Sequence, residues 1–160
     1  MTTEEKIFDA ARIVFQKKGF AGARMQEIAD EAGINKAMLH YCFKNKQSLF
    51  EAVFMKAFSQ LAPQINLIFR SNESIFDKIR QFTHSYISFV INHPFLPQFI
   101  VQEMNNNPEF VMQFLNHENR PNPSLMITQI EAEIAAGIIK PIPPKQLLLD
   151  IFSLTVFPFA

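Results

Sequence analysis

Residues 25–46 read MQEIADEAGINKAMLHYCFKNK, and this stretch decides the fold. The apolar residues of its first part have the spacing of a helix with one buried face: Met25, Ile28, Ala29 and Ala32. Gly33 follows, where a left-handed residue ends a helix at little cost. Asn35 is a good N-cap for a second helix, expected over residues 36–43. Two helices joined by a short glycine-containing turn are typical of a helix-turn-helix.

The second of these helices has a thin buried side, formed by Leu39 and Phe43. At about 100° per residue, Ala37, Met38 and Tyr41 point roughly the other way. An exposed helix face that carries Met and Tyr is costly to leave in water without a partner. We therefore interpret it as a recognition helix, which would enter a groove of DNA.

The run IADEAGINKAMLHYCFKNKQSLFEAV, residues 28–53, resembles the DNA-binding region of the tetracycline-repressor (TetR) family of bacterial transcription regulators. The flanking segment KIFDAARIVFQKKGFAGARM, residues 6–25, is similar to the first helix and following loop of that family. The resemblance covers about the first third of the chain and rests on these residues: Ile28, Ala29, Ala32, Gly33, Ile34, Leu39, Tyr41, Phe43, Lys44, Lys46, Leu49 and Phe50.

The resemblance implies contacts to double-stranded DNA. Tyr41 matches an aromatic residue that packs against the DNA backbone or thymine methyl groups, and Lys46 matches a phosphate-contacting lysine. The residues expected at the DNA are Arg24, Gln26, Lys36, Ala37, Met38, His40, Tyr41 and Lys46. Most of the base-facing side chains are apolar or can both donate and accept hydrogen bonds. The operator sequence therefore does not follow from them.

Composition is that of a folded globular chain. The 160 residues are 48% hydrophobic and 19% charged, with 18 Phe and no Trp. No apolar run has the length of a membrane span, and the N-terminus is charged rather than signal-like. A single Cys excludes an intramolecular disulfide and fits a reducing compartment, so we expect a cytoplasmic protein that does not bind membranes.

The net charge of zero conceals a local excess of positive charge. Residues 1–50 hold eight Lys and Arg against six Asp and Glu, whereas residues 51–160 hold seven against nine. No acidic residue lies within residues 32–50, which contain Lys36, Lys44 and Lys46. Local sign matters more than total charge for contact with phosphates.

Helical periodicity continues along the rest of the chain, and the predicted fold is all-α. We expect a three-helix helix-turn-helix domain over residues 1–46 and a helical ligand-binding and dimerisation domain over residues 47–160. A long amphipathic helix begins at Lys46, and Pro63 is expected to kink or end it. Ser71 or Asn72 is expected to cap the next helix.

Apolar residues concentrate in the second domain, where 13 of the 18 Phe lie after residue 50. Such residues are most often plain core. The resemblance implies instead an apolar pocket for a small hydrophobic or planar ligand, with the candidates Phe58, Phe82, Tyr86, Phe89, Phe99, Met104 and Phe114. The histidines lack metal-ligand spacing, so neither a metal nor a cofactor is expected.

The last helix is expected over residues 146–157 and is apolar on nearly every side, so it needs several partners. The resemblance implies pairing of the last two helices into a dimer interface. The candidate dimer or core residues are Leu147, Leu148, Ile151, Phe152 and Thr155. Because the family usually has a further helix, the chain is expected to be truncated at its C-terminus, or its last helix to be disordered or absent.

The preferred function is therefore a DNA-binding transcriptional regulator, a ligand-responsive repressor that binds a palindromic operator as a homodimer. The alternative is a helix-turn-helix protein whose C-terminal domain binds a protein partner instead of a small molecule. An enzyme has little support, because the sequence has no nucleophile elbow, phosphate-binding glycine loop or metal spacing.

Overall fold

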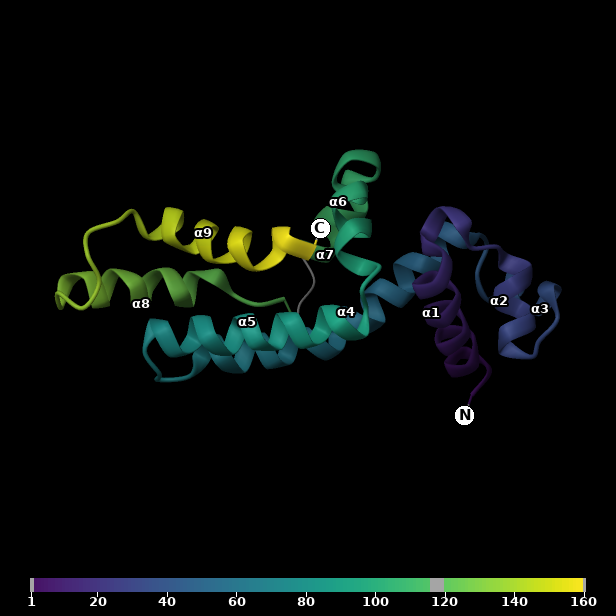
Figure 1. The fold of residues 1–160 in the computed structure, drawn as a ribbon, viewed down its shortest axis with the longest axis horizontal. Coiled ribbons are helices and arrows are strands. Elements are labelled where there is room, and N and C mark those ends of the chain that lie inside the picture. Colours follow the sequence, from purple (N-terminus) through teal and green to yellow (C-terminus); the bar gives the residue numbers. More distant parts are fainter. Residues whose placement is uncertain (1, 116–119, 160) are drawn as a thin grey trace.

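A computed structural model describes residues 2–115 and 120–159, and all regular structure in these ranges is helical. Figure 1 shows an elongated molecule in which α1–α3 form one end and α4 leads away from them to a layer shared with α5. α8 and α9 lie along this layer, and α6 and α7 project from its end nearest to α1. The helices are α1 (Thr3–Gly22), α2 (Met25–Ala32), α3 (Lys36–Cys42), α4 (Lys46–Arg70), α5 (Ile75–Asn92), α6 (Leu96–Asn106), α7 (Pro108–Leu115), α8 (Pro123–Ala135) and α9 (Pro144–Val156). The predicted all-α fold is confirmed.

Local sequence sets the boundaries of the first three helices. Thr2 and Glu5 form a capping box at the start of α1. Gly19, at φ 65° and ψ 177°, interrupts the helical conformation before the end of α1. Gly33 ends α2 in the left-handed conformation, and the Asn35 side chain accepts a hydrogen bond of 2.7 Å from the backbone N–H of Met38. The turn chemistry expected from the sequence is confirmed.

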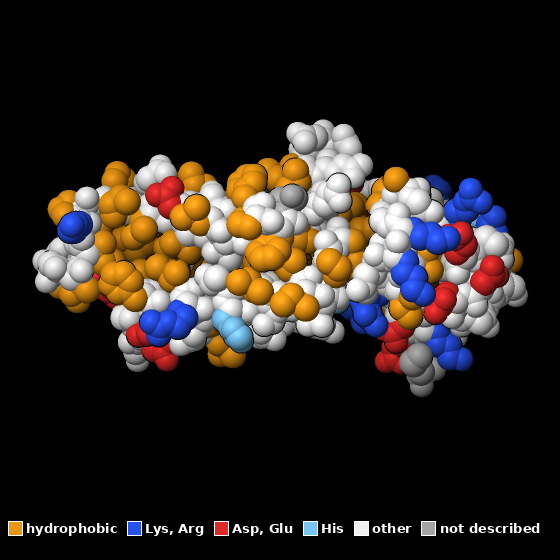
Figure 2. Space-filling view, in the orientation of Figure 1, with side chains coloured by type: hydrophobic (Ala, Val, Ile, Leu, Met, Phe, Trp, Pro, Cys, Tyr) orange, Lys and Arg blue, Asp and Glu red, His pale blue; other side chains and the backbone are white. Residues whose placement is uncertain are grey.

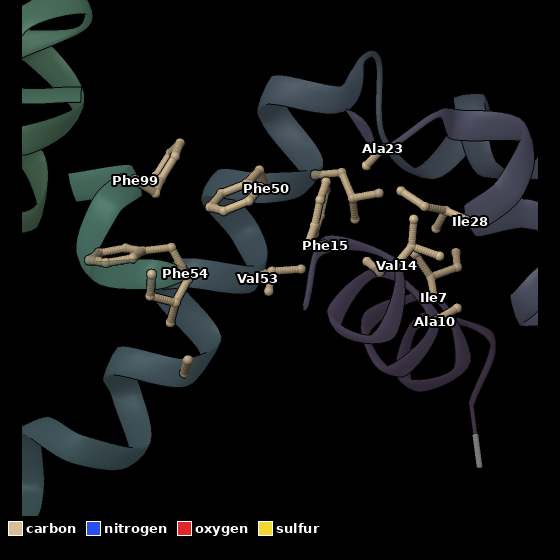
Figure 3. Packing of buried hydrophobic residues seen from close by; sticks show 14 of the residues in the cluster. Ile7, Ala10, Val14, Phe15, Ala23, Ile28, Phe50, Val53, Phe54 and Phe99 are labelled. Carbon is tan, nitrogen blue, oxygen red and sulfur yellow. The ribbon is translucent and has the colours of Figure 1, made fainter. Parts of the chain in front are cut away.

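A cluster of aromatic rings joins the N-terminal helices to α6. Phe50 of α4 lies between Phe15 of α1 and Phe99 of α6, with ring centroids 4.5 Å and 4.0 Å away (Figure 3). Phe20 and Phe95 contact the same ring at 5.2 Å and 5.6 Å. Because each aromatic pair adds about 0.5–1.5 kcal/mol beyond its buried area, the start of α4 belongs to the core of the N-terminal helices.

α4 runs for 25 residues through Pro63, so of the two expected outcomes, a kink or an end of the helix, the end is wrong. Residues on both sides of Pro63 are held by packing, since Leu61 and Ile65 are both buried in a second core with α5, α8 and α9. This tertiary packing outweighs the loss of one backbone donor. α4 therefore spans both cores as one helix.

At the far end of the molecule, a buried polar cluster joins α4, α5 and α8. The Lys78 ammonium, 2% exposed, donates a 2.8 Å hydrogen bond to the Phe69 carbonyl at the end of α4. Burial lowers the pKa of Lys78, and the nearby carboxylates of Glu133 and Glu73 act in the opposite direction. Ser74, not Ser71 or Asn72, caps α5, and its hydroxyl accepts from the backbone N–H of Asp77. The earlier positions are wrong because Ser71 instead ends α4.

The burial of His93 makes the free energy of unfolding depend on pH. Its Nδ1 is buried without a hydrogen-bond partner in the described part of the chain, and burial together with Arg12 lowers its pKa. Since the unfolded histidine has a pKa of about 6.5, the unfolded chain takes up a proton first as the pH falls. The stability contributed by neutral His93 is thus complete above about pH 6.5 and is lost as the pH falls through the folded-state pKa.

We expect His93→Asn to lose less of its free energy of unfolding than the unchanged chain between about pH 7 and pH 5. Urea titrations at several pH values measure this difference. His84→Asn is the matched control, because His84 is exposed, and it should follow the unchanged chain. An identical pH dependence in the His93 and His84 variants would contradict the assignment to His93.

Candidate nucleic-acid interface and apolar pocket

α3 is exposed along almost its whole surface. Only Leu39 is buried, while Tyr41 is 89% exposed and Met38 is 43% exposed. Lys36, Ala37 and His40 are exposed as well. A seven-residue helix that buries one side chain presents its remaining surface to a partner.

Contacts from α1 and α2 hold α3 in place. The Lys18 ammonium bridges to the Glu27 carboxylate of α2 at 2.7 Å. This hydrogen bond is the main reason that the pKa of Glu27 lies below its ordinary value. Phe43, directly after α3, packs edge-on against Phe8 of α1 at 5.8 Å. The three helices therefore pack as one body, and the outer face of α3 is exposed on its surface.

Charged side chains gather over this end of the molecule, whereas hydrophobic side chains are spread over the face formed by α4, α5, α8 and α9 (Figure 2). Arg24, Lys36 and Lys44 are exposed in and around the helix-turn-helix. Gln26 is also exposed, but its amide donates to Asp30 at 2.7 Å, so part of its hydrogen-bonding capacity is used. Cations beside the recognition helix suit contact with phosphates.

Lys46 is placed differently from the phosphate contact that the resemblance implies. Its ammonium donates to three backbone carbonyls at the C-terminal end of α1, those of Phe20 at 2.7 Å, Ala21 at 3.3 Å and the C-cap residue Ala23 at 3.0 Å. It also lies 4.6 Å from the centroid of the Phe20 ring. All three ammonium protons thus have partners within the chain, and Lys46 fastens α4 to the C-terminal end of α1.

A cavity of about 410 Å³ lies between α4, α5, α6, α9 and the segment before α8. Four of the predicted ligand residues line it, namely Phe58, Phe82, Tyr86 and Phe89. The remaining lining residues are Phe54, Leu61, Ile65, Phe69, Leu96, Pro97, Ile100, Arg120, Pro121, Pro123, Phe152 and Val156. Burial raises the pKa of Tyr86 to about 12.

Two other predicted ligand residues lie elsewhere, which corrects their assignment. Phe99 is 2% exposed and its ring packs among Phe50, Phe54 and Phe110. Met104 is 61% exposed. Phe99 turns toward the aromatic rings instead of the cavity, and Met104 lies one turn beyond Ile100, past the residues of α6 that line the cavity. Phe114 lies in α7, and its side chain falls outside the described ones.

The predicted dimer residues face mainly their own chain. Leu148, Ile151 and Thr155 are buried, and Phe152 lines the cavity. Leu147 is partly buried against the second core. The outward face of α9 carries instead Leu149, 58% exposed, and Leu154, 78% exposed.

No helix of the described ranges is long and apolar enough to cross a membrane. Within the same ranges, no three His, Cys, Asp or Glu side chains come together as metal ligands would.

Comparison with known proteins identifies the family. The family model described as "Bacterial regulatory proteins, tetR family" matches residues 7–53. The biofilm operon icaADBC HTH-type negative transcriptional regulator IcaR of Staphylococcus aureus is 33% identical over 110 residues, which cover 66% of this chain and 55% of IcaR. The chain belongs to the tetR family.

Solved structures of the tetR family share the whole described fold. A transcriptional regulator of the TetR/AcrR family from Thermobifida fusca has a TM-score of 0.76 at 17% identity, covering 98% of this chain and 83% of that one. FadR from Bacillus subtilis, solved in complex with stearoyl-CoA, has a TM-score of 0.70 at 18% identity, covering 97% and 84%. The curated relatives are regulators rather than enzymes, which confirms that expectation. The chain spans a little over half of their length.

Sequence reasoning missed several residues of these sites. Ile65 and Phe69 continue the α4 stripe that lines the cavity, and their spacing from Phe58 along a helix was available as a signal. Leu149 and Leu154 were missed because α9 is apolar on all sides, so its pattern does not distinguish the inward face from the outward one. Arg120 carried no signal in the sequence.

The position of Lys46 generates a prediction. Lys46→Ala should lower the free energy of unfolding by about 1.5–3 kcal/mol, the range for a hydrogen bond to a charged group. Lys44→Ala, at an exposed lysine two residues away, should leave it unchanged. Urea unfolding of both variants measures the difference. Unchanged stability of the Lys46 variant together with weaker DNA binding would instead support the phosphate contact.

Proposed function

We propose that the chain is a repressor that binds a palindromic operator as a homodimer and releases it when a small apolar ligand fills the cavity. The observation that carries DNA binding is the exposure of α3, whose outer face presents Tyr41 and Met38 beside Lys36. A helix of this kind fits the major groove, with its N-terminal residues nearest the base edges. Arg24, Lys36 and Lys44 then supply phosphate contacts.

The outward surfaces of the C-terminal helices support homodimerisation. Leu149 and Leu154 of α9 are exposed together with Leu125 of α8 and Phe157 after α9. Exposed large apolar side chains on two neighbouring helices favour burial against an identical surface. A two-fold axis at this interface would place two copies of α3 on two half-sites, which is the symmetry of a palindrome.

The position of α6 between the cavity and the N-terminal helices supports control of DNA binding by the ligand. Leu96, Pro97 and Ile100 line the cavity, whereas Phe99 contacts Phe20 and Phe50 on the other side. A ligand that displaces the cavity-lining face of α6 therefore moves Phe99 against α1 and α4. This movement shifts the population of orientations in which the N-terminal helices can bind DNA.

Hydrogen bonds reinforce this connection. The Gln47 amide of α4 donates to the carboxylate of Glu103, which is 4% exposed, and also to Glu51 at 2.9 Å. Asn107 donates to the same Glu51 at 3.0 Å. The open cavity and the stearoyl-CoA complex of FadR both favour a small ligand over a protein partner.

Binding of fluorescent DNA from the protein's own promoter region tests the DNA-binding proposal. Tyr41→Ala should weaken specific binding about tenfold or more, in line with about 1–3 kcal/mol for a lost base contact. Its stability should not change, since Tyr41 is 89% exposed. Leu67→Ala, at a 73% exposed residue of α4, is the control. Equal affinity of both variants at several salt concentrations would refute the assignment of this face.

The dimer proposal predicts that Leu154→Glu increases the dimer dissociation constant at least about tenfold, because a buried charge without a partner opposes association. Sedimentation equilibrium measures the constant. Leu67→Glu places the same charge on an exposed leucine of α4 and should leave association unchanged. A Leu154→Glu variant that remains as dimeric as the unchanged chain would exclude this interface.

A further inference from the structure

We infer that the cavity takes a single unbranched acyl chain whose negatively charged head lies at Arg120. This inference names the ligand class of the cavity and rests on the function proposed for it. It goes beyond an apolar ligand of unspecified shape, because the length, width and chemistry of the cavity each restrict what fits.

The cavity is long because its lining follows one face of α4. Phe54, Leu61 and Phe69 all contribute to its wall. The 15 residues from Phe54 to Phe69 correspond to about 22 Å at the helical rise of 1.5 Å per residue. Phe82, Tyr86 and Phe89 of the neighbouring helix α5 line the cavity as well.

The cavity is also narrow. A volume of about 410 Å³ spread over about 22 Å gives a mean cross-section of about 19 Å² for the centres of ligand atoms. Carbon atoms in contact lie about 3.5–4.0 Å apart, so a file of methylene groups fits along this length.

The chemistry of the wall matches the body of an acyl chain. Of the lining side chains, only Tyr86 and Arg120 carry polar groups. With about 30 Å³ for a group of the size of water, the cavity holds roughly 14 methylene groups. Each methylene that leaves water tightens binding about fourfold.

Arg120 places the head of the ligand. It lines the cavity and is nevertheless exposed, so it lies at the mouth, where its stem can cover apolar surface while its guanidinium stays in water. Within the described ranges, no carboxylate lies within ion-pair distance of it. A guanidinium binds a carboxylate or a phosphate through paired hydrogen bonds. The head is therefore a free carboxylate or the phosphate of a carrier joined to the acyl chain as a thioester.

Calorimetric titration of the full chain tests this inference without DNA. The probes are saturated fatty acids of 8 to 18 carbons, the 1-alkanols of the same lengths, the corresponding acyl-CoA thioesters and anthracene-9-carboxylate. The dissociation constant should fall about fourfold for each added methylene and stop falling near 14 carbons. Tighter binding of either the acids or the thioesters identifies the head, and both results support an acyl chain.

Arg120→Gln should weaken binding of the anionic probes about tenfold or more and leave the alkanols unchanged. Arg80→Gln, at an arginine of α5 that pairs with Asp77 away from the cavity, is the matched control. Ile100→Trp should shorten the preferred chain by filling part of the cavity. Tighter binding of anthracene-9-carboxylate than of any chain, or no dependence on chain length, would overturn the inference.

The outcomes separate this inference from the DNA-binding proposal. A chain that binds its operator but none of the acyl probes would refute the ligand class alone. A chain that binds the acyl probes as expected but no operator would leave the ligand class intact and refute the regulator proposal.

Discussion

The structure depends on the packing of Phe50 against aromatic rings on two sides. Its ring meets Phe15 and Phe20 of α1 on one side and Phe95 and Phe99 at the start of α6 on the other. Because Phe50 is in the second turn of α4, the helix that leaves the N-terminal body is anchored at its base. Interiors are close-packed, so a shift on one side of this ring requires an adjustment on the other. The same contact therefore stabilises the junction, and in the proposed ligand control it connects the cavity with the N-terminal helices.

Two consecutive residues at the start of α4 extend this connection with polar contacts. Lys46 binds carbonyls at the C-terminal end of α1, and Gln47 binds Glu103 of α6. Neighbouring residues of one helix point in directions about 100° apart, so α4 reaches both partners from a single turn. A long helix held at its base in this way moves as one body. Residues of α4 from Phe54 to Phe69 line the cavity, so the proposed ligand would contact the helix that follows the helix-turn-helix directly.

Sequence reasoning succeeded where a local rule decides the conformation. Gly33 and Asn35 bound the turn between α2 and α3 as expected, and Leu39 is the one residue of α3 that is buried. It failed where partners distant in sequence decide. Lys46 has the right type and position for a phosphate contact, but the carbonyls that bind it belong to residues 20–23. Phe99 and Phe58 have similar local patterns, yet only Phe58 reaches the cavity.

The sequence by itself determined the helical class, the helix-turn-helix with its turn, and the face of α3 that remains exposed. Capping, left-handed glycine and helical periodicity act over a few residues, so they can be recognised without knowledge of the rest of the chain. Only the tertiary structure decided which apolar residues of α4, α5, α6 and α9 form a wall and which form solid core. Aromatic rings at the same spacing fill a space or leave one open according to the distance between helices, and that distance is set by all the side chains packed between them.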